Sequence, residues 1–259
     1  MYWRLEYSCY FKPRKIKRIN INYEYTSRNE IAIIADTIGE KFKNGKIKFI
    51  GIAGPSASGK TTFSKKLGLL LKSLGIVTTV ISMDDYFKNR KDIPKNKNVN
   101  YDFECLEALR IDDFNSDLNK LYQSEEINRC VFDFVNGTYS YKKDDVLKLP
   151  DKESDKTGVV LCEGLHGIDE RVTPSIPRDE KFFIYIAPLT PINSDEYNLF
   201  SEYVLRLYRR MIRNYRTRGG NNTSKTLKNW LSVAKGEEKY IYPFIDSSDL
   251  IRNSLLIMK

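Results

Sequence analysis

Residues 54–61 carry the clearest chemical pattern in the sequence. Gly54, Gly59, Lys60 and Thr61 match the spacing G-x-x-x-x-G-K-[ST] without a mismatch. In such a loop, called a P-loop, backbone N–H groups surround a phosphate, the lysine reaches the β- and γ-phosphates and the hydroxyl coordinates Mg²⁺. The pattern therefore predicts binding of ATP with Mg²⁺ by the residues Gly54, Ser56, Ala57, Ser58, Gly59, Lys60, Thr61 and Thr62.

Three carboxylates follow apolar runs that are typical of buried strands. Asp84 and Asp85 follow residues 77–81, and Glu163 follows residues 159–162. Ligands of an open parallel sheet bind at the carboxyl ends of its strands, so these acids are expected beside the P-loop. Side-chain alternation lets one of the two aspartates point at the site while the other braces it, although a simple turn or helix cap is the alternative. Glu163 is predicted to hold Mg²⁺ or its water together with Thr61.

A stripe of arginines marks a helix in the last third of the chain. We expect this helix to run from a cap at Ser194 to about Arg216, and a basic glycine-containing segment, 216–220, follows it. An arginine stripe is usually a solvated face. Here the flexible basic tip favours a lid that closes over the transferred phosphate. Most of the four arginines at helical spacing lie on one stripe, and the four are Arg206, Arg209, Arg210 and Arg213.

Strand and helix patterns alternate around these residues. Apolar residues in 47–52 predict the strand before the P-loop, and those in 63–74 predict the helix behind it. Asn136 and Gly137 predict a hairpin turn after a short strand at 131–134. Further expected elements are a helix over 31–42 with a capping box at Ser27 and Glu30, a strand over 182–187, and a helix from Thr223 or Ser224 that Gly236 ends. The alternation predicts an α/β, three-layer P-loop NTPase fold with a parallel sheet, a helical arginine-rich lid and a short N-terminal extension.

Length and composition favour one large domain. Of the 259 residues, we assign 1–45 to an N-terminal extension and 46–259 to the catalytic domain. In the extension we expect a small β-hairpin within 1–25, with a nucleic-acid or subunit contact as the alternative, and an amphipathic helix. The N-terminus has no apolar signal region and no run reaches 18 apolar residues, so we expect a cytoplasmic protein without a membrane partner. Four cysteines without C-x-x-C spacing and a single histidine argue against a zinc site or a histidine triad.

The net charge of +9 is concentrated in two regions. Residues 1–50 hold 11 Lys/Arg against 5 Asp/Glu, and residues 206–239 hold 10 against 2. Basic regions on both sides of a phosphate-binding core suit a polyanionic ligand such as ATP. Nucleic acid is the less favoured partner, and the sequence does not decide whether the protein forms a homo-oligomer.

Together these residues resemble the uridine kinase and phosphoribulokinase family of P-loop kinases. The chain looks most similar to bacterial nucleoside kinases whose longer members carry threonyl-tRNA-synthetase-like N-terminal domains. The resemblance extends from about residue 30 to 258, and residues 1–25 lie outside it. It rests on eight stretches in the family's order: 54–63, 82–87, 101–104, 132–134, 163–167, 188–190, 206–219 and 236–239.

The resemblance implies transfer of the ATP γ-phosphate to the 5′-hydroxyl of a nucleoside. It implies that Asp84 takes the proton of that hydroxyl, that Asp102 holds the ribose hydroxyls, and that Glu163 lies near Mg²⁺. Aromatic residues at the matching positions of the substrate pocket are Phe87, Tyr101 and Phe132. Lid arginines that contact ATP and the transferred phosphate are Arg210, Arg213 and Arg218.

The chain departs from the family pattern in three places, and the first two of them put uridine itself in question. Phe132 stands where uridine–cytidine kinases usually have a tyrosine, the histidine that reads the pyrimidine edge is missing from 135–141, and Gly220 replaces the last lid arginine. We therefore expect broader or altered base use, and the nearest hydroxyls that could replace the lost contact belong to Thr138, Tyr139 and Tyr141. Two alternatives remain: a nucleotide- and RNA-binding module without kinase activity, and a kinase acting on another small alcohol such as a sugar phosphate or a pantothenate-like compound.

Overall fold

The computed structural model describes residues 26–43, 47–95, 101–150, 158–189, 192–193, 199–217 and 223–254. A parallel five-stranded sheet forms the centre of these residues, in the order β2-β5-β1-β6-β9. Its strands are β1 (Phe49–Ala53), β2 (Val77–Ser82), β5 (Gly158–Glu163), β6 (Lys181–Ala187) and β9 (Leu250–Asn253). The strand that leads into the P-loop is central: Phe49 of β1 is paired with Val160 of β5 on one side and with Lys181 of β6 on the other.

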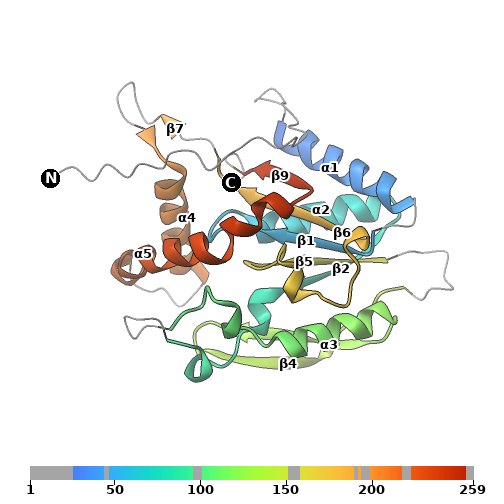
Figure 1. The fold of residues 1–259 in the computed structure, drawn as a ribbon, viewed down its shortest axis with the longest axis horizontal. Coiled ribbons are helices and arrows are strands. Elements are labelled where there is room, and N and C mark those ends of the chain that lie inside the picture. The colour runs from blue at the N-terminus through green and yellow to red at the C-terminus, as the bar shows by residue number, and fades with distance from the viewer. Residues whose placement is uncertain are drawn as a thin grey trace.

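Both faces of the sheet are covered, which gives three layers (Figure 1). Helices α1 (Thr26–Lys43) and α2 (Lys60–Ser73) pack on one face, and α3 (Ile111–Tyr122) lies on the other side of the sheet. Every residue of β1 and β6 is buried, as expected for parallel strands with helices on both faces. The α/β fold predicted from the alternation of elements is thus confirmed.

Helix α1 is firmly attached to the main body. Ile31, Ile34 and Ile38 are almost fully buried in the same apolar cluster as Phe63 and Leu67 of α2. At its first turns Glu30 accepts a 3.1 Å hydrogen bond from the buried Arg252 of β9. The amphipathic pattern of 31–42 therefore faces the core, as the periodicity predicts.

An antiparallel hairpin extends the second face of the molecule. It consists of β3 (Ile127–Asp133) and β4 (Thr138–Leu147), and Phe132 is paired with Tyr139. Gly137 adopts a left-handed φ of 74° and donates a 2.6 Å hydrogen bond to the carbonyl of Asp133. The turn predicted at Asn136 and Gly137 is confirmed, and the strand before it is longer than the four residues expected.

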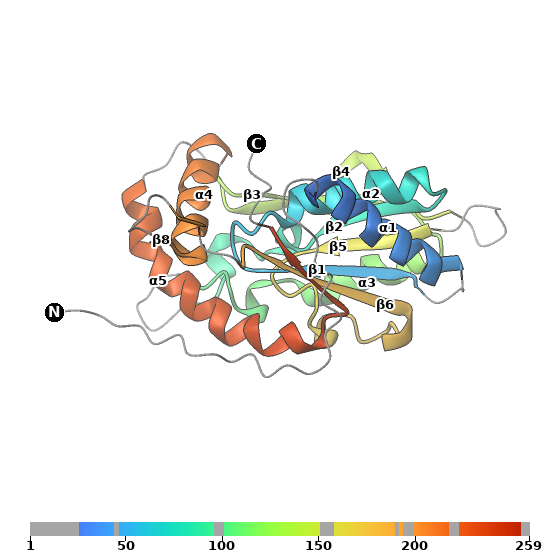
Figure 2. The same cartoon turned by 90° about the horizontal axis from the view of Figure 1, so that it is seen from above.

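Two helices, α4 (Glu202–Thr217) and α5 (Thr223–Tyr240), gather at one end of the sheet (Figure 2). Helix α4 does not start at Ser194, because the two-residue strands β7 (Ile192–Asn193) and β8 (Leu199–Phe200) pair with each other first. The hydroxyl of Ser201 instead accepts a hydrogen bond from the N–H of Val204, as an N-cap residue does.

The prediction that Gly236 ends α5 is wrong, since the helix continues through it. A Cβ atom at this position would lie 2.4 Å from Cβ of Glu104. Glycine is needed here for close packing of the helix on the loop of Glu104, not for a left-handed helix end.

Short 3₁₀ turns complete the described structure. They are η1 (Met83–Tyr86), η2 (Arg90–Asp92), η3 (Leu106–Ala108), η4 (Glu170–Val172), η5 (Arg178–Glu180) and η6 (Tyr242–Ser247). The hairpin expected within 1–25, Ser194, and the lid tip with Arg218 and Gly220 lie outside the described residues. Among the described helices, none combines the length and apolarity needed to cross a membrane.

Candidate active site

The P-loop leaves the end of β1 and turns into the first residue of α2. Ala57 and Gly59 adopt left-handed φ angles of 61° and 98°. A non-glycine residue with positive φ is uncommon and often marks a functional loop. Gly54 is required for packing, because a Cβ atom there would lie 2.0 Å from the carbonyl oxygen of Ile186. These backbone angles fold the loop into a cradle in front of the α2 N-terminus, where N–H groups favour a phosphate.

Lys60 folds back over the first half of this cradle. Its Nζ donates hydrogen bonds to the carbonyl oxygens of Gly54 at 2.8 Å and Pro55 at 3.3 Å. Burial lowers the pKa of Lys60, while the negative charges of Glu163 and Asp84 act to raise it. The lysine thus lies among the acids that were expected to share the site with it.

Thr61 and Glu163 meet at the junction of α2 and β5. The Thr61 hydroxyl donates a 2.8 Å hydrogen bond to Oε1 of Glu163, and the Ser82 hydroxyl donates to the same oxygen at 3.1 Å. Parallel pairing causes this meeting, because Glu163 is in register with Ile52 of β1 and Ser82 of β2. Glu163 is only 5% exposed, and burial, with Asp84 second, raises its pKa.

The donor set at this junction fits Mg²⁺. Magnesium prefers hard oxygen ligands and is usually held by one or two protein groups together with substrate phosphates and waters. Thr61 and Glu163 provide a hydroxyl and a carboxylate in contact with each other. Within the described ranges no group of three or more His, Cys, Asp or Glu could form an all-protein metal site. The hydroxyl and carboxylate in contact match the two protein groups of a Mg²⁺ site that substrate phosphates and waters complete.

The two adjacent aspartates have different surroundings. Oδ1 of Asp85 accepts a 3.2 Å hydrogen bond from the backbone N–H of Phe132, which joins η1 to the hairpin. Burial raises the pKa of Asp85 to about 6. The charge of Asp84 instead contributes to raising the pKa of both Lys60 and Glu163. Asp85 thus makes the bracing contact, and Asp84 acts electrostatically on the P-loop side.

An aromatic cluster lies beside η1. The ring of Phe87 makes edge contacts with Phe103, Phe132 and Phe134 at centroid distances of 5.3, 5.6 and 6.3 Å. Tyr101, the other expected pocket aromatic, is 40% exposed. Close to it, Oδ1 of Asp102 accepts a 3.1 Å hydrogen bond from the N–H of Glu104. Of the residues expected to bind the acceptor, Asp84 and Phe87 thus lie in and directly after η1. The others lie on segment 101–104 and on the hairpin, and both of these contact Phe87.

The arginines of α4 do not form one solvated stripe. Nη1 of Arg210 donates a 2.7 Å hydrogen bond to the Ser56 hydroxyl of the P-loop and lies 3.9 Å from Glu104. Arg213 is close enough for its charge to contribute to lowering the pKa of Lys60. Arg206 is buried and forms a 2.7 Å ion pair with Glu237 of α5. Arg218, the third expected lid arginine, lies outside the described residues.

Sequence reasoning missed Glu104 and Glu237 as neighbours of the P-loop. The backbone N–H of Ser56 donates to Oε1 of Glu237 at 2.8 Å, across 181 positions of sequence. Burial raises the pKa of Glu104 to about 7, with opposing effects from the charges of Arg210 and Glu237. The only sequence signal for either residue was its presence in a stretch that matches the family.

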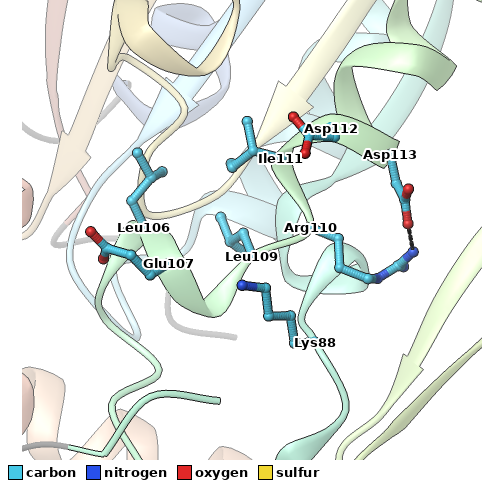
Figure 3. A pocket seen from close by; sticks show the side chains of 8 residues that line it. All are labelled: Lys88, Leu106, Glu107, Leu109, Arg110, Ile111, Asp112 and Asp113. Atoms are coloured by element: carbon cyan, nitrogen blue, oxygen red, sulfur yellow. Dashed lines mark hydrogen bonds and ion pairs between the residues drawn. The ribbon is translucent and has the colours of Figure 1, made fainter. Parts of the chain in front are cut away.

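A separate pocket of 430 Å³ opens near the N-terminus of α3 (Figure 3). Its lining includes Lys88, Glu107 and Arg110 and none of the residues assigned to nucleotide or acceptor. Arg110 forms an ion pair with Asp113, stacks 3.4 Å from the ring centre of Tyr139 and donates to the Tyr141 hydroxyl at 3.2 Å. Both tyrosines considered as replacements for the lost base contact are thus engaged with Arg110.

Comparison with known proteins agrees with this geometry. Residues 49–257 match the model of the Phosphoribulokinase / Uridine kinase family. The chain belongs to this family. The curated relatives below are uridine kinases, and the chain is accordingly a phosphotransferase with an alcohol acceptor.

Curated relatives of this phosphoribulokinase / uridine kinase family protein include several bacterial uridine kinases. That of Borrelia duttonii is 27% identical over 206 residues, which cover 79% of this chain and 85% of the relative. That of Chlamydia pneumoniae is 27% identical over 203 residues, covering 78% and 79%. A uridine kinase of Leuconostoc citreum is 35% identical over 89 residues, which are 34% of this chain and 42% of the relative.

Solved structures share the fold at lower identity. A putative fructose transport system kinase from Silicibacter has a TM-score of 0.56 at 16% identity and covers 86% of this chain and 98% of its own. D-glycerate 3-kinase from Cryptococcus neoformans has a TM-score of 0.56 at 14% identity, covering 85% and 89%. At these identities the likeness concerns the fold of the family and leaves the acceptor open.

Proposed function

We propose that this family member transfers the γ-phosphate of ATP to the 5′-hydroxyl of a nucleoside. The observation that carries the proposal is the contact of Thr61 with Glu163, at a point where the charges of Lys60 and Asp84 also act. The proposal is supported by the meeting of the P-loop, the candidate cation site and the candidate base at one edge of the sheet. The uridine kinases among the relatives support a nucleoside as the acceptor.

The chain's own groups provide positioning and charge neutralisation on the nucleotide side. In-line phosphoryl transfer needs little covalent participation by the protein. The loop N–H groups at the start of α2 hold the phosphates, and Lys60 neutralises charge between the β- and γ-phosphates. Mg²⁺, when bound by Thr61 and Glu163, supplies further neutralisation of the phosphate oxygens. Arg210, Arg213 and Arg218 stabilise the charge that spreads over the transferred group.

On the acceptor side, Asp84 orients the 5′-hydroxyl and takes its proton as the bond from phosphorus to that oxygen forms. The bond between the γ-phosphorus and its bridging oxygen breaks, and ADP leaves with the electron pair. Asp102 accepts hydrogen bonds from the ribose hydroxyls. The rings of Phe87, Tyr101 and Phe132 form apolar walls for the base. The products are ADP and a nucleoside 5′-monophosphate.

The deciding experiment measures ADP release across a panel of acceptors. The panel contains ribo- and deoxynucleosides, fructose, D-glycerate, sugar phosphates and pantothenate, each with ATP and Mg²⁺. We expect ADP release with at least one nucleoside and a product whose mass and fragmentation identify a 5′-monophosphate. If ADP is released only with an alcohol that is not a nucleoside, that alcohol is the acceptor and the proposed nucleoside is wrong. Salt-dependent RNA binding without ATP consumption in any reaction would favour the RNA-binding alternative.

A further inference from the structure

One residue of the P-loop is held from outside the loop at all three of its polar groups. The N–H of Ser56 donates to Oε1 of Glu237 at 2.8 Å, and its carbonyl oxygen accepts from Nη1 of Arg206 at 3.3 Å. Its hydroxyl accepts from Nη1 of Arg210 at 2.7 Å. All three partners belong to α4 and α5. Ser56 is therefore a point at which both of these helices are attached to the P-loop.

The partners of Ser56 form a buried charge cluster. Glu237 is 0% exposed and Arg206 is 3% exposed, and Oε1 of Glu237 accepts from both Arg206 and Ser56. The guanidinium of Arg206 also lies 5.4 Å from the ring centre of Trp230, which restricts its position. Separating the two charges is costly, because removing either partner of a buried ion pair leaves a desolvated charge.

The place of Ser56 in the loop suggests what this cluster does. Nζ of Lys60, the group that reaches between β- and γ-phosphates, contacts the carbonyls of Gly54 and Pro55 directly before Ser56. The residues directly before Ser56 thus lie beside the group that reaches the γ-phosphate, whereas the N–H groups of such a loop surround the α- and β-phosphates. Arg210, held on Ser56, stands at the γ-phosphate end.

We propose that Glu237, together with Arg206, is a positioning residue that fixes Ser56 and thereby keeps Arg210 at the γ-phosphate end of the loop. This inference rests on the proposed use of ATP. The parts of α4 and α5 that carry Arg206, Arg210 and Glu237 then belong to the nucleotide site together with the P-loop. Loss of the cluster weakens recognition of the γ-phosphate and leaves recognition of ADP in place.

The test compares binding of ADP with binding of the non-hydrolysable analogue AMP-PNP, each with Mg²⁺, by calorimetry. Glu237→Gln removes the charge that holds Arg206 and Ser56. The double variant Arg206→Met with Glu237→Leu removes both charges, and such apolar replacement of a buried ion pair often leaves a protein folded. Glu238→Gln, on the exposed neighbouring residue of the same helix, is the matched control. Thermal unfolding establishes that each variant is folded.

We expect both Glu237 variants to bind AMP-PNP about 5- to 150-fold more weakly, the usual range of coupling between two groups, with less than about twofold change for ADP. The control should match the wild type for both ligands. Equal weakening of both ligands, or an unchanged preference for AMP-PNP in the folded double variant, would overturn the inference. Failure of the wild type to bind either nucleotide would instead disprove the use of ATP, and the inference would fall with it.

Discussion

The Thr61 hydroxyl and the Glu163 carboxylate are 2.8 Å apart, although 102 positions separate them in the sequence. This contact joins the first turn of α2 to the last residue of β5. It exists because β1 and β5 are parallel neighbours, so the loop after one strand and the acid at the end of the other reach the same edge. The candidate cation site is thus a direct product of the strand order.

The first prediction concerns this contact. Glu163→Gln retains a hydrogen-bond acceptor for Thr61 but removes the negative charge. We expect kcat to fall by about 10²–10³, the usual cost of one electrostatic group in an active site, and the Mg²⁺ concentration for half-maximal turnover to rise. Kinetics at a series of Mg²⁺ concentrations measure both, with Glu126→Gln on an exposed residue as control. An unchanged Mg²⁺ dependence would contradict the assignment of Glu163.

The second prediction separates the adjacent aspartates. Asp84→Asn should reduce kcat by about 10²–10⁴, as expected for a general base, and leave ATP affinity roughly intact. Asp85→Asn should lower the free energy of unfolding but change kcat less than about tenfold, because Asp85 braces the hairpin through Phe132. Turnover and calorimetric ATP titration measure the two effects. If Asp84→Asn keeps its turnover and Asp85→Asn loses it, the roles are reversed.

The third prediction concerns pH. Burial raises the pKa of Glu104 from 4.5 to about 7. Between these values the folded protein holds a proton that the unfolded chain has lost, so this residue's contribution to stability is present below pH 4.5 and is lost as pH rises through 7. The difference between the two pKa values corresponds to about 3 kcal/mol in the free energy of unfolding. Urea unfolding from pH 5 to 8 should show a smaller decline in stability for Glu104→Gln than for the wild type. If the free energy of unfolding depends on pH in the same way for both proteins, the pKa of Glu104 is not raised.

The fourth prediction addresses base selectivity. A site that hydrogen-bonds a base edge can reject analogues by 10⁴-fold or more, whereas an apolar pocket discriminates by about 10–200-fold. Phe132 is buried against Phe87 and has no hydroxyl. We therefore expect values of kcat/KM for uridine, cytidine, adenosine, guanosine and their deoxy forms to stay within about 200-fold of one another. A preference for uridine and cytidine above roughly a thousandfold would mean that another polar group reads the pyrimidine.

The fifth prediction tests the packing of α5. Alanine normally stabilises an exposed helix interior relative to glycine by about 1 kcal/mol. Gly236→Ala should instead destabilise the protein by about 1–3 kcal/mol, because the added Cβ meets the stem of Glu104. Denaturant unfolding measures the change, and Lys235→Ala on the exposed side of the same helix should stay within about 0.5 kcal/mol. A gain in stability for Gly236→Ala would show that the two segments separate readily.

Local pattern was sufficient for the parts of the site that lie at strand ends. The apolar run of β1, the P-loop and the acid after β5 all follow from short-range periodicity plus the rule that parallel strands end at one edge. Side-chain alternation along a strand predicts that Asp84 and Asp85 point in different directions. In the structure, Asp85 accepts a hydrogen bond from the N–H of Phe132 and so contacts the hairpin.

The attachments of α4 and α5 could not be predicted in this way. Arg206 and Arg210 share a helix face and look alike in sequence, yet one is buried against Glu237 and the other reaches Ser56. Glycine at position 236 suits a helix end and a close contact equally well, and only the tertiary contact with Glu104 decides between them. In both cases contacts between residues far apart in the sequence decide which of two locally equivalent arrangements forms.

The central position of β1 also sets the order in which this chain can fold during its synthesis. Phe49 is synthesised long before its sheet neighbours, which are Val160 of β5 and, further along the chain, Lys181 of β6. At about 5–20 residues per second, roughly ten seconds pass before the latter is made. Until β5 is made, the apolar strand β1 lacks both of its hydrogen-bonding neighbours, and until β6 is made it lacks one of them. Such open edges can pair with other nascent chains. The sheet around the nucleotide loop is therefore incomplete until β6 has been made, and chaperones that shield apolar strands are expected to raise the yield of active protein.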